Sequence, residues 1–190
     1  NRIKTMSLKF EKCLALSNES SFRHLFKGCR LKYLNNLNIY LKYCYYINSF
    51  LKNFLKYFQG SRDLAHFSIS LVESVQFNDA HLSQLCKQLS SFTNLKSLNL
   101  ELFWLTRVTN SGLMMFCTTL RKMKNLRAIG IKLIGCRRFS AEGFTWLMTE
   151  LSKIHCLEFL DLRLTQSNFK GASMDLFSKI LLPPLQKLTV

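Results

Sequence analysis

The sequence predicts an α/β solenoid in which one strand and one helix recur about every 31 residues, with a parallel sheet on the concave side and helices on the convex side. Three observations predict this fold class: a spaced apolar triplet that recurs along the chain, a helical apolar stripe that follows it, and polar residues between them that can begin a helix. The 190 residues, 48% of them hydrophobic, suffice to bury a continuous core.

The recurring triplet contains three apolar residues, separated first by two residues and then by one. Its clearest copies begin at Leu64, Leu95, Leu126 and Leu157, each 31 residues after the one before. Further copies begin at Ile3, Leu34 and Leu185. Because the last two members lie two residues apart, as in a strand, they share one buried face. We therefore expect a single repeat domain over 1–190, with degenerate repeats in 1–60 and clear repeats in 61–190.

Apolar residues at helical spacing follow the strand in the three clearest units. The three stripes are Leu82, Leu85, Cys86 and Leu89; Leu113, Phe116, Cys117 and Leu120; and Phe144, Leu147, Met148 and Leu151. Asn78, Thr109 and Ser140 come just before these helices, so we expect them to be helix caps. Since methionine occupies the third copy of the position held by the two cysteines, both thiols are predicted to be core side chains.

These units resemble leucine-rich repeats of the ribonuclease-inhibitor-like subclass. The residues that carry the resemblance read NLKSLNLELFWLTRVTNSGLMMFCTTL from residue 94 and NLRAIGIKLIGCRRFSAEGFTWLMTEL from residue 125. In each, strand, turn, a helix start containing Gly112 or Gly143, and helix follow in the order typical of that subclass. The resemblance implies a horseshoe that binds partners, and the irregular units are similar to those of protist repeat proteins, including parts of ciliary and other large assemblies.

One feature departs from that family. Three residues past the last apolar residue of the triplet, where the family usually places Asn or Cys to bond the turn backbone, this chain has Val72, Phe103, Ile134 and Thr165. We therefore expect the asparagine ladder to be absent and the turn to be about three residues longer. A triplet begins at Ile3 and another closes at Val190, so neither end carries a visible cap, and we expect the chain to be part of a longer array.

The predicted partner-binding surface consists of strand residues that point away from the core. Its members are Tyr40, His66, Asn99, Glu101, Lys132, Phe159, Asp161 and Arg163. This concave face is polar and nearly balanced in charge, with Tyr40 and Phe159 as anchors, which favours a protein or peptide over a phosphate backbone. The alternative interpretation is a solvated sheet face without a ligand, because exposed strand positions are polar in any case.

The charge of the chain is strongly positive. Twenty-seven Lys and Arg against 11 Asp and Glu give a net charge of +16, which favours an acidic protein surface or RNA as partner, unless it reflects genome base composition. A basic cluster is predicted to line one rim of the solenoid: Arg121, Lys122, Lys124, Arg127, Arg137 and Arg138. Basic residues near a helix C-terminus also have a local explanation in the helix dipole.

Aromatic and basic residues interleave between residues 33 and 58, a pattern that single-strand nucleic-acid sites share. Most of this aromatic content is predicted to be core, because a helical stripe accounts for Phe50, Leu51, Phe54, Leu55 and Phe58. Tyr43, Tyr45 and Tyr46 fall outside the stripe and are open to either interpretation.

No catalytic constellation is present in the sequence, so we expect no enzyme, no cofactor, no metal and no small-molecule substrate. The seven cysteines are odd in number and lack close pairs, which predicts reduced thiols in an intracellular compartment, cytoplasmic or cytoskeletal. Lys or Arg interrupts every apolar run, so no membrane span is expected. The leading hypothesis is a non-catalytic protein-interaction or scaffolding module of a larger assembly. The alternative is an RNA-associated or acidic-surface-binding component, ribonucleoprotein or cytoskeletal.

Overall fold

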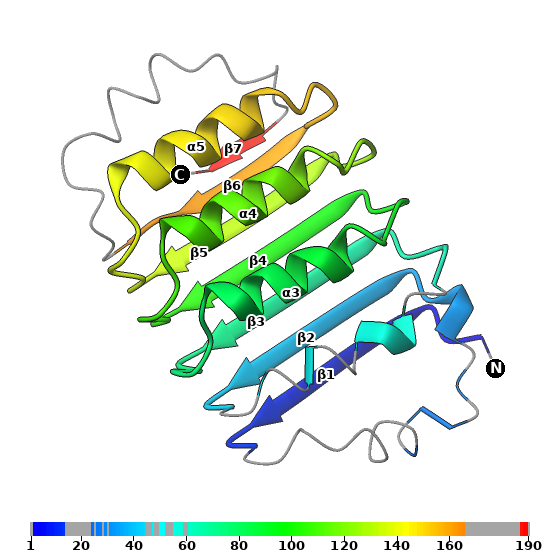
Figure 1. Cartoon of the computed structure of the whole chain (residues 1–190). Helices are drawn as coiled ribbons and strands as arrows, with labels where there is room; N and C mark the ends of the chain where they lie inside the picture. The colour runs from blue at the N-terminus through cyan, green and yellow to red at the C-terminus, as the bar shows by residue number, and fades with distance from the viewer. Residues whose placement is uncertain are drawn as a thin grey trace.

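The computed structural model describes residues 2–13, 31–44, 61–165 and 187–189, together with residues 24, 26, 27, 29, 47, 50, 51 and 55–58. These residues form an α/β protein with one open sheet, in which every neighbouring pair of strands is parallel (Figure 1). The strands stand in chain order, so each unit adds its strand beside the strand of the unit before it.

The strands lie where the apolar triplets predict them. They are β1 Thr5–Glu11, β2 Asn36–Lys42, β3 His66–Val72, β4 Ser97–Phe103, β5 Ala128–Ile134, β6 Phe159–Arg163 and β7 Lys187–Thr189. The register places Leu98 opposite Ile129 and Ile129 opposite Leu160. Equivalent residues of successive units are therefore neighbours, which confirms that the 31-residue period is a structural repeat.

In the described part of the chain, three α-helices cover one face of the sheet, and no described element covers the other face in Figure 1. They are α3 Asp79–Leu89, α4 Asn110–Leu120 and α5 Ala141–Ser152; two short 3-10 helices, η1 Leu31–Tyr33 and η2 Leu55–Phe58, lie in earlier units. All twelve predicted stripe residues of α3, α4 and α5 are buried. Each helix runs back along the sheet after its strand, so its apolar stripe packs on the strands' inward side chains.

The first leucines of the triplets occupy one repeated environment. Leu64, Leu95, Leu126 and Leu157 are at most 2% exposed. The N–H group of each donates to the carbonyl three residues before it, as in Leu95 to Phe92 at 3.2 Å and Leu157 to Ile154 at 3.0 Å. In the earlier aromatic segment, Phe50, Leu51, Leu55 and Phe58 are buried as predicted, whereas Phe54, Tyr45 and Tyr46 lie outside the described residues.

Each strand continues one inward residue beyond the triplet. Leu71, Leu102 and Leu133 point into the core and are at most 1% exposed. The residues after them, Val72, Phe103 and Ile134, are still paired in the sheet and point to the open face. These three positions were assigned to the turn from the sequence, so the turn itself begins later than predicted.

Side chains bond the turn backbone, but they are those of cysteines and a serine and not of asparagines. Cys136 Sγ donates to the Leu102 carbonyl at 3.4 Å, and Cys44 Sγ donates to the Phe10 carbonyl at 3.6 Å. Two units lie between these cysteines: Ser74 holds the equivalent position in the first, where its hydroxyl donates to Val72 O at 3.4 Å, and the buried Leu105 holds it in the second. The ladder lies two residues later than the triplet spacing implies, because the strand is one residue pair longer.

The residue before each ladder position adopts a left-handed backbone. Positive φ values recur at Lys12, Tyr43, Glu73, Trp104 and Gly135. The N–H groups of Glu73 and Trp104 donate to Phe103 O at 2.9 Å and Ile134 O at 2.8 Å, on the next strand. This conformation costs a non-glycine residue roughly 1–2 kcal/mol, and it reverses the chain so that the sheet bonding continues up to the turn.

The helix starts are tied to one another across units. The Asp79 carboxylate accepts from the Thr109 N–H at 2.8 Å and from the Thr109 hydroxyl at 2.6 Å. Asn110 repeats the contact one unit later: its Oδ1 accepts from the Ser140 N–H at 2.9 Å, and its Nδ2 donates to the Ser140 hydroxyl at 2.6 Å. A Cβ at Gly112 would lie 2.4 Å from Asp79 Oδ1, so this contact requires glycine.

The three predicted cap residues are the N-caps of α3, α4 and α5, and two of them bond the first turn of the helix. The Asn78 side chain accepts from two N–H groups of the first turn of α3, and Thr109 accepts from the Ser111 N–H. Ser140 is the N-cap residue of α5, as predicted, but its side chain makes no capping hydrogen bond. The physical reason is the bond from Asn110, which occupies the Ser140 hydroxyl.

Candidate functional site

The open face of the sheet brings the predicted partner-binding residues into rows that cross the strands. Tyr40, Glu101, Lys132 and Arg163 stand in one row, with Lys9 and Ser70 completing it. A second row contains His66 and Phe159, and a third contains Asn99 and Asp161. All eight predicted residues therefore lie on one face, but no row contains all of them.

The centre of the open face is an ion pair between neighbouring strands. Lys132 Nζ lies 2.5 Å from Glu101 Oε1, and their side chains are 22% and 18% exposed. Asn99 Nδ2 donates to the same carboxylate oxygen at 3.3 Å. Burial by itself would raise the pKa of Glu101, but the bonds from Lys132 and Asn99 outweigh it, so its pKa is lowered. The pair is a fixed feature of the face that stays charged at neutral pH.

Short polar side chains on the open face bond to one another across strands. Asn99 Nδ2 donates to the Ser68 hydroxyl at 3.1 Å, and Asn38 Nδ2 donates to the Ser7 hydroxyl at 3.2 Å. On the far side of Asn99, a Cβ at Gly130 would lie 2.4 Å from Asn99 Oδ1. Ser7, Asn38, Ser68 and Asn99 therefore form a shallow polar surface between the charged row and the edge where the strands begin. We call this surface the polar floor.

Two aromatic side chains predicted as anchors differ in accessibility. Phe159 is 41% exposed. Tyr40 is half-buried, and the Lys9 ammonium lies 5.5 Å from the centre of its ring. A shallow hollow of about 310 Å³ lies beside Tyr40, between it and Glu101. Phe159 is thus the more available of the two for contact with a partner.

An apolar row that sequence reasoning missed borders the open face. Val72, Phe103 and Ile134 lie side by side at the carboxyl ends of β3, β4 and β5, each half-buried. Trp104 follows this row and is 39% exposed. The signal was present in the sequence, because these residues continue the strand alternation one step past the triplet. The open face therefore offers more apolar contact area than its predicted polar composition suggested.

The predicted basic rim is divided between opposite edges of the sheet, so the expectation of one rim is wrong. We call the edge where the strands begin the amino edge, and the edge where they end the carboxyl edge. The cluster's members at the amino edge are Arg121, Lys122, Lys124 and Arg127, while Arg137 and Arg138 follow β5 at the carboxyl edge. The helix runs antiparallel to its strand, so the loop after a helix and the loop after a strand lie at opposite edges.

Acidic residues of the next unit neutralise part of the cluster. Arg121 forms a two-bond contact with the Glu150 carboxylate, at 2.7 and 2.5 Å, and Arg127 pairs with Glu158. The bond from Arg121 lowers the pKa of Glu150 to about 2, with a further contribution from Lys153. Two of the predicted rim residues therefore carry structural ion pairs.

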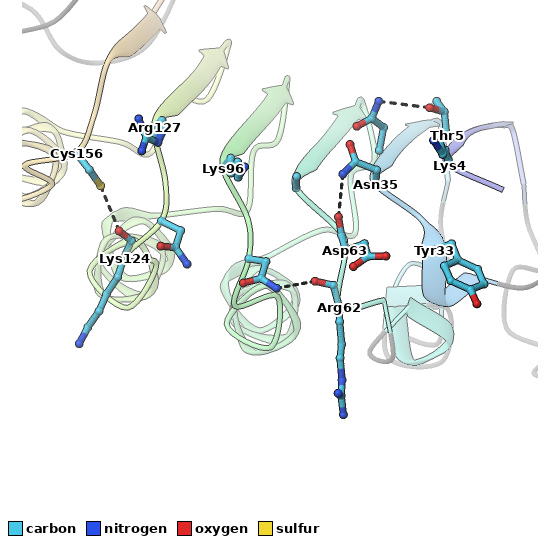
Figure 2. A pocket seen from close by; sticks show the side chains of 14 residues that line it. Lys4, Thr5, Tyr33, Asn35, Arg62, Asp63, Lys96, Lys124, Arg127 and Cys156 are labelled. Atoms are coloured by element: carbon cyan, nitrogen blue, oxygen red, sulfur yellow. Dashed lines mark hydrogen bonds between the residues drawn. The ribbon is translucent and has the colours of Figure 1, made fainter. Parts of the chain in front are cut away.

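A groove of about 1000 Å³ runs along the amino edge, and sequence reasoning did not single it out (Figure 2). Cationic residues that line it include Lys4, Arg62, Lys96, Lys124 and Arg127. In Figure 2, Arg62 and Lys124 extend away from the strands on the helix side, whereas Lys96 and Arg127 lie where β4 and β5 begin. We call this hollow the amino-edge groove.

Side-chain bonds to backbone carbonyls form the floor of the amino-edge groove. Asn94 Nδ2 donates to Arg62 O at 2.7 Å, and Asn125 Nδ2 donates to Thr93 O at 3.0 Å. In the next unit Cys156 makes the equivalent contact, and its Sγ donates to Lys124 O at 3.2 Å. These contacts repeat every 31 residues and hold the loops that present the cations.

Four of the seven thiols and one imidazole are buried. The four buried thiols are those of Cys44, Cys86, Cys117 and Cys136. Burial raises the pKa of Cys86 and Cys136 to about 11 and that of Cys117 to about 12. His81 is also buried, with a lowered pKa, and its Nδ1 accepts from the Asn78 N–H at 3.1 Å. Thiolates and imidazolium ions are therefore disfavoured at these positions near neutral pH.

Within the described ranges, no group of three His, Cys, Asp or Glu could hold a metal ion. In that same part of the chain, no helix has the length and apolar character needed to cross a bilayer. No protein-family model matches the sequence, and no curated protein is significantly similar to it.

Proposed function

We propose that the chain is a leucine-rich-repeat array of the ribonuclease-inhibitor-like subclass and serves as a non-catalytic protein-binding or scaffolding module. The all-parallel sheet in chain order, the register of about 31 residues and the single helix layer support this assignment. In such an array each unit contacts only its neighbours, and the strand face is the concave binding surface.

One observation carries the functional proposal: the described helices leave the strand face open, and that face combines charged and apolar rows. Phe159 is exposed where β6 begins and Trp104 is exposed just after β4 ends, and the half-buried ion pair of Glu101 and Lys132 lies in a row between these two ends of the strands. Aromatic anchors beside fixed charges are typical of protein interfaces. A protein segment laid across the strands is therefore the partner that this face suits best.

A non-catalytic role is supported by the state of the nucleophilic side chains. The four buried thiols lie in the apolar core, and burial holds the pKa of three of them at about 11 to 12. Seven free cysteines also support a reducing intracellular compartment, because secreted proteins of this size usually pair their cysteines.

Site-specific photo-crosslinking tests the proposal. A photoreactive phenylalanine analogue replaces Phe159 on the open face, and in a matched control it replaces Met114, which is 47% exposed on the helix layer. We expect a discrete protein adduct in cell extract of the source organism from the Phe159 position and none from the Met114 position. Equal adducts from both positions, or none from Phe159, would count against the open face as the binding surface.

A further inference from the structure

The cations of the open face differ in their partners from the cations of the amino-edge groove. On the open face, Lys132 pairs with Glu101, Arg163 with Asp161 and Lys9 with Glu11. In the amino-edge groove, Lys4, Arg62, Lys96 and Lys124 are exposed, and none of them pairs with a carboxylate from the described part of the chain. The amino-edge groove therefore contains at least four cations that no carboxylate of the described residues neutralises by an ion pair.

The repeat itself arranges these cations in two rows. Lys4, Lys96 and Arg127 hold the position just before a strand, as the bonds from Asn36, Ala128 and Phe159 N–H groups to their carbonyls show. Arg62 and Lys124 form the second row on the helix side (Figure 2). Strands in a sheet lie about 4.8 Å apart, so the groove follows the amino edge from β1 to β6 for roughly 24 Å.

One end of the groove adds an aromatic ring with further cations. Tyr33 lines the groove near β1, with the Arg2 guanidinium 4.6 Å and the Lys32 ammonium 4.9 Å from the centre of its ring. Among the described residues that line the groove, Asp63 is the one carboxylate. A chain of negative charges would therefore meet attraction along the whole length of the hollow.

We infer that the amino-edge groove binds a single nucleic-acid strand through its phosphates, as a second surface independent of the proposed protein-binding face. Apart from Asp63, Ala65 and Cys156, the described wall residues are Lys, Arg, Asn, Thr and Tyr, whose side chains can contact phosphate and sugar oxygens. An acidic protein would need apolar anchors as well. Among the described residues, the exposed large apolar side chains are those of Val75, Trp104, Met114 and Phe159, and none of these lines the groove. Recognition of phosphates alone predicts binding without sequence preference.

Fluorescence anisotropy with a labelled twelve-nucleotide oligouridylate, titrated with the 190-residue chain from 50 to 200 mM salt, tests this inference. Four phosphate contacts give a slope of about −3 in log affinity against log salt, or roughly 50-fold weaker binding across that range. Replacing Lys96→Ala and Lys124→Ala together removes two contacts, so binding at 50 mM salt falls by roughly tenfold or more and the salt effect shrinks to about sevenfold.

The matched control is the pair Arg107→Ala and Arg138→Ala, which removes the same charge from the carboxyl edge. We expect this pair to retain the wild-type slope and affinity within about twofold. An equal loss of affinity in both double variants would show that the effect depends only on net charge, and it would contradict binding in the amino-edge groove. A slope shallower than about −1, no binding at 50 mM salt, or equal affinity for a labelled twelve-residue polyglutamate would also overturn it. Failure here leaves the crosslinking result at Phe159 unaffected.

Discussion

The contact between Asp79 and Thr109 joins the start of α3 to the start of α4. Its removal should weaken the stabilising contact between these two neighbouring units. Asp79→Ala deletes the acceptor of a 2.8 Å bond from the Thr109 N–H and of a 2.6 Å bond from its hydroxyl. The N–H group lies at a half-buried cap, where water replaces the carboxylate only in part. The substitution therefore removes two bonds and leaves a poorly satisfied donor.

Hydrogen bonds to a charged group contribute about 1.5–3 kcal/mol each. Because Asp79 and Thr109 are half-buried, we take less than the full value and expect the free energy of unfolding to fall by about 2–3 kcal/mol. Urea denaturation followed by far-UV circular dichroism measures this change, and amide hydrogen exchange at Thr109 and Ser111 locates it. Faster exchange should be confined to α4 and its neighbours, since repeat units contact only adjacent units.

The chain supplies its own control for this experiment. Asn110 makes the equivalent pair of bonds to Ser140 with a neutral amide, so Asp79→Asn should retain both contacts with Thr109. We expect Asp79→Asn to cost less than about 1 kcal/mol. The reasoning is refuted if Asp79→Ala changes the free energy of unfolding by less than about 0.5 kcal/mol, or if Asp79→Asn is as destabilising as Asp79→Ala.

Three further predictions follow from the same structure. Gly112→Ala places a Cβ 2.4 Å from Asp79 Oδ1 and should cost about 1–3 kcal/mol in urea denaturation, whereas in the Asp79→Ala background the cost should nearly vanish. The four buried thiols should resist a thiol reagent at pH 8 in the native state and react in denaturant, while Cys13, Cys29 and Cys156 react first; rapid native labelling of all seven would contradict the core assignment. The pKa of Glu150 lies at about 2, below its ordinary 4.5, so its ion pairs stabilise the fold fully above pH 4.5 and are lost as the pH falls toward 2. Glu150→Gln should flatten that part of a stability–pH curve, and an unchanged curve would contradict it.

Most of the fold could be predicted because burial in a repeat is encoded locally. The alternation around Leu98 and Leu100 and the stripe from Leu113 to Leu120 each describe one face of one element, and no distant residue is needed to interpret them. The prediction was wrong at the end of the strand, because Val72, Phe103 and Ile134 belong to the strands and not to the turn. The spacing within one unit does not say where pairing with the next unit stops.

The sites were less predictable, because they depend on relations between units. Glu101 and Lys132 were each predicted on the binding face, but their contact at 2.5 Å joins residues 31 apart and requires the register. The amino-edge groove gathers Lys4, Arg62 and Lys96 from separate units, and no segment of the sequence contains them together.

The sequence by itself determined the repeat, the strand positions and the buried side chains, because hydrophobic periodicity dictates which residues avoid water. Only the tertiary structure decided which charges meet. Residues 121 to 138 form one basic run along the chain, yet the intervening strand carries its two ends to opposite edges of the sheet. The antiparallel course of helix and strand is the reason, since it sends consecutive loops to alternate edges and brings loops of separate units together.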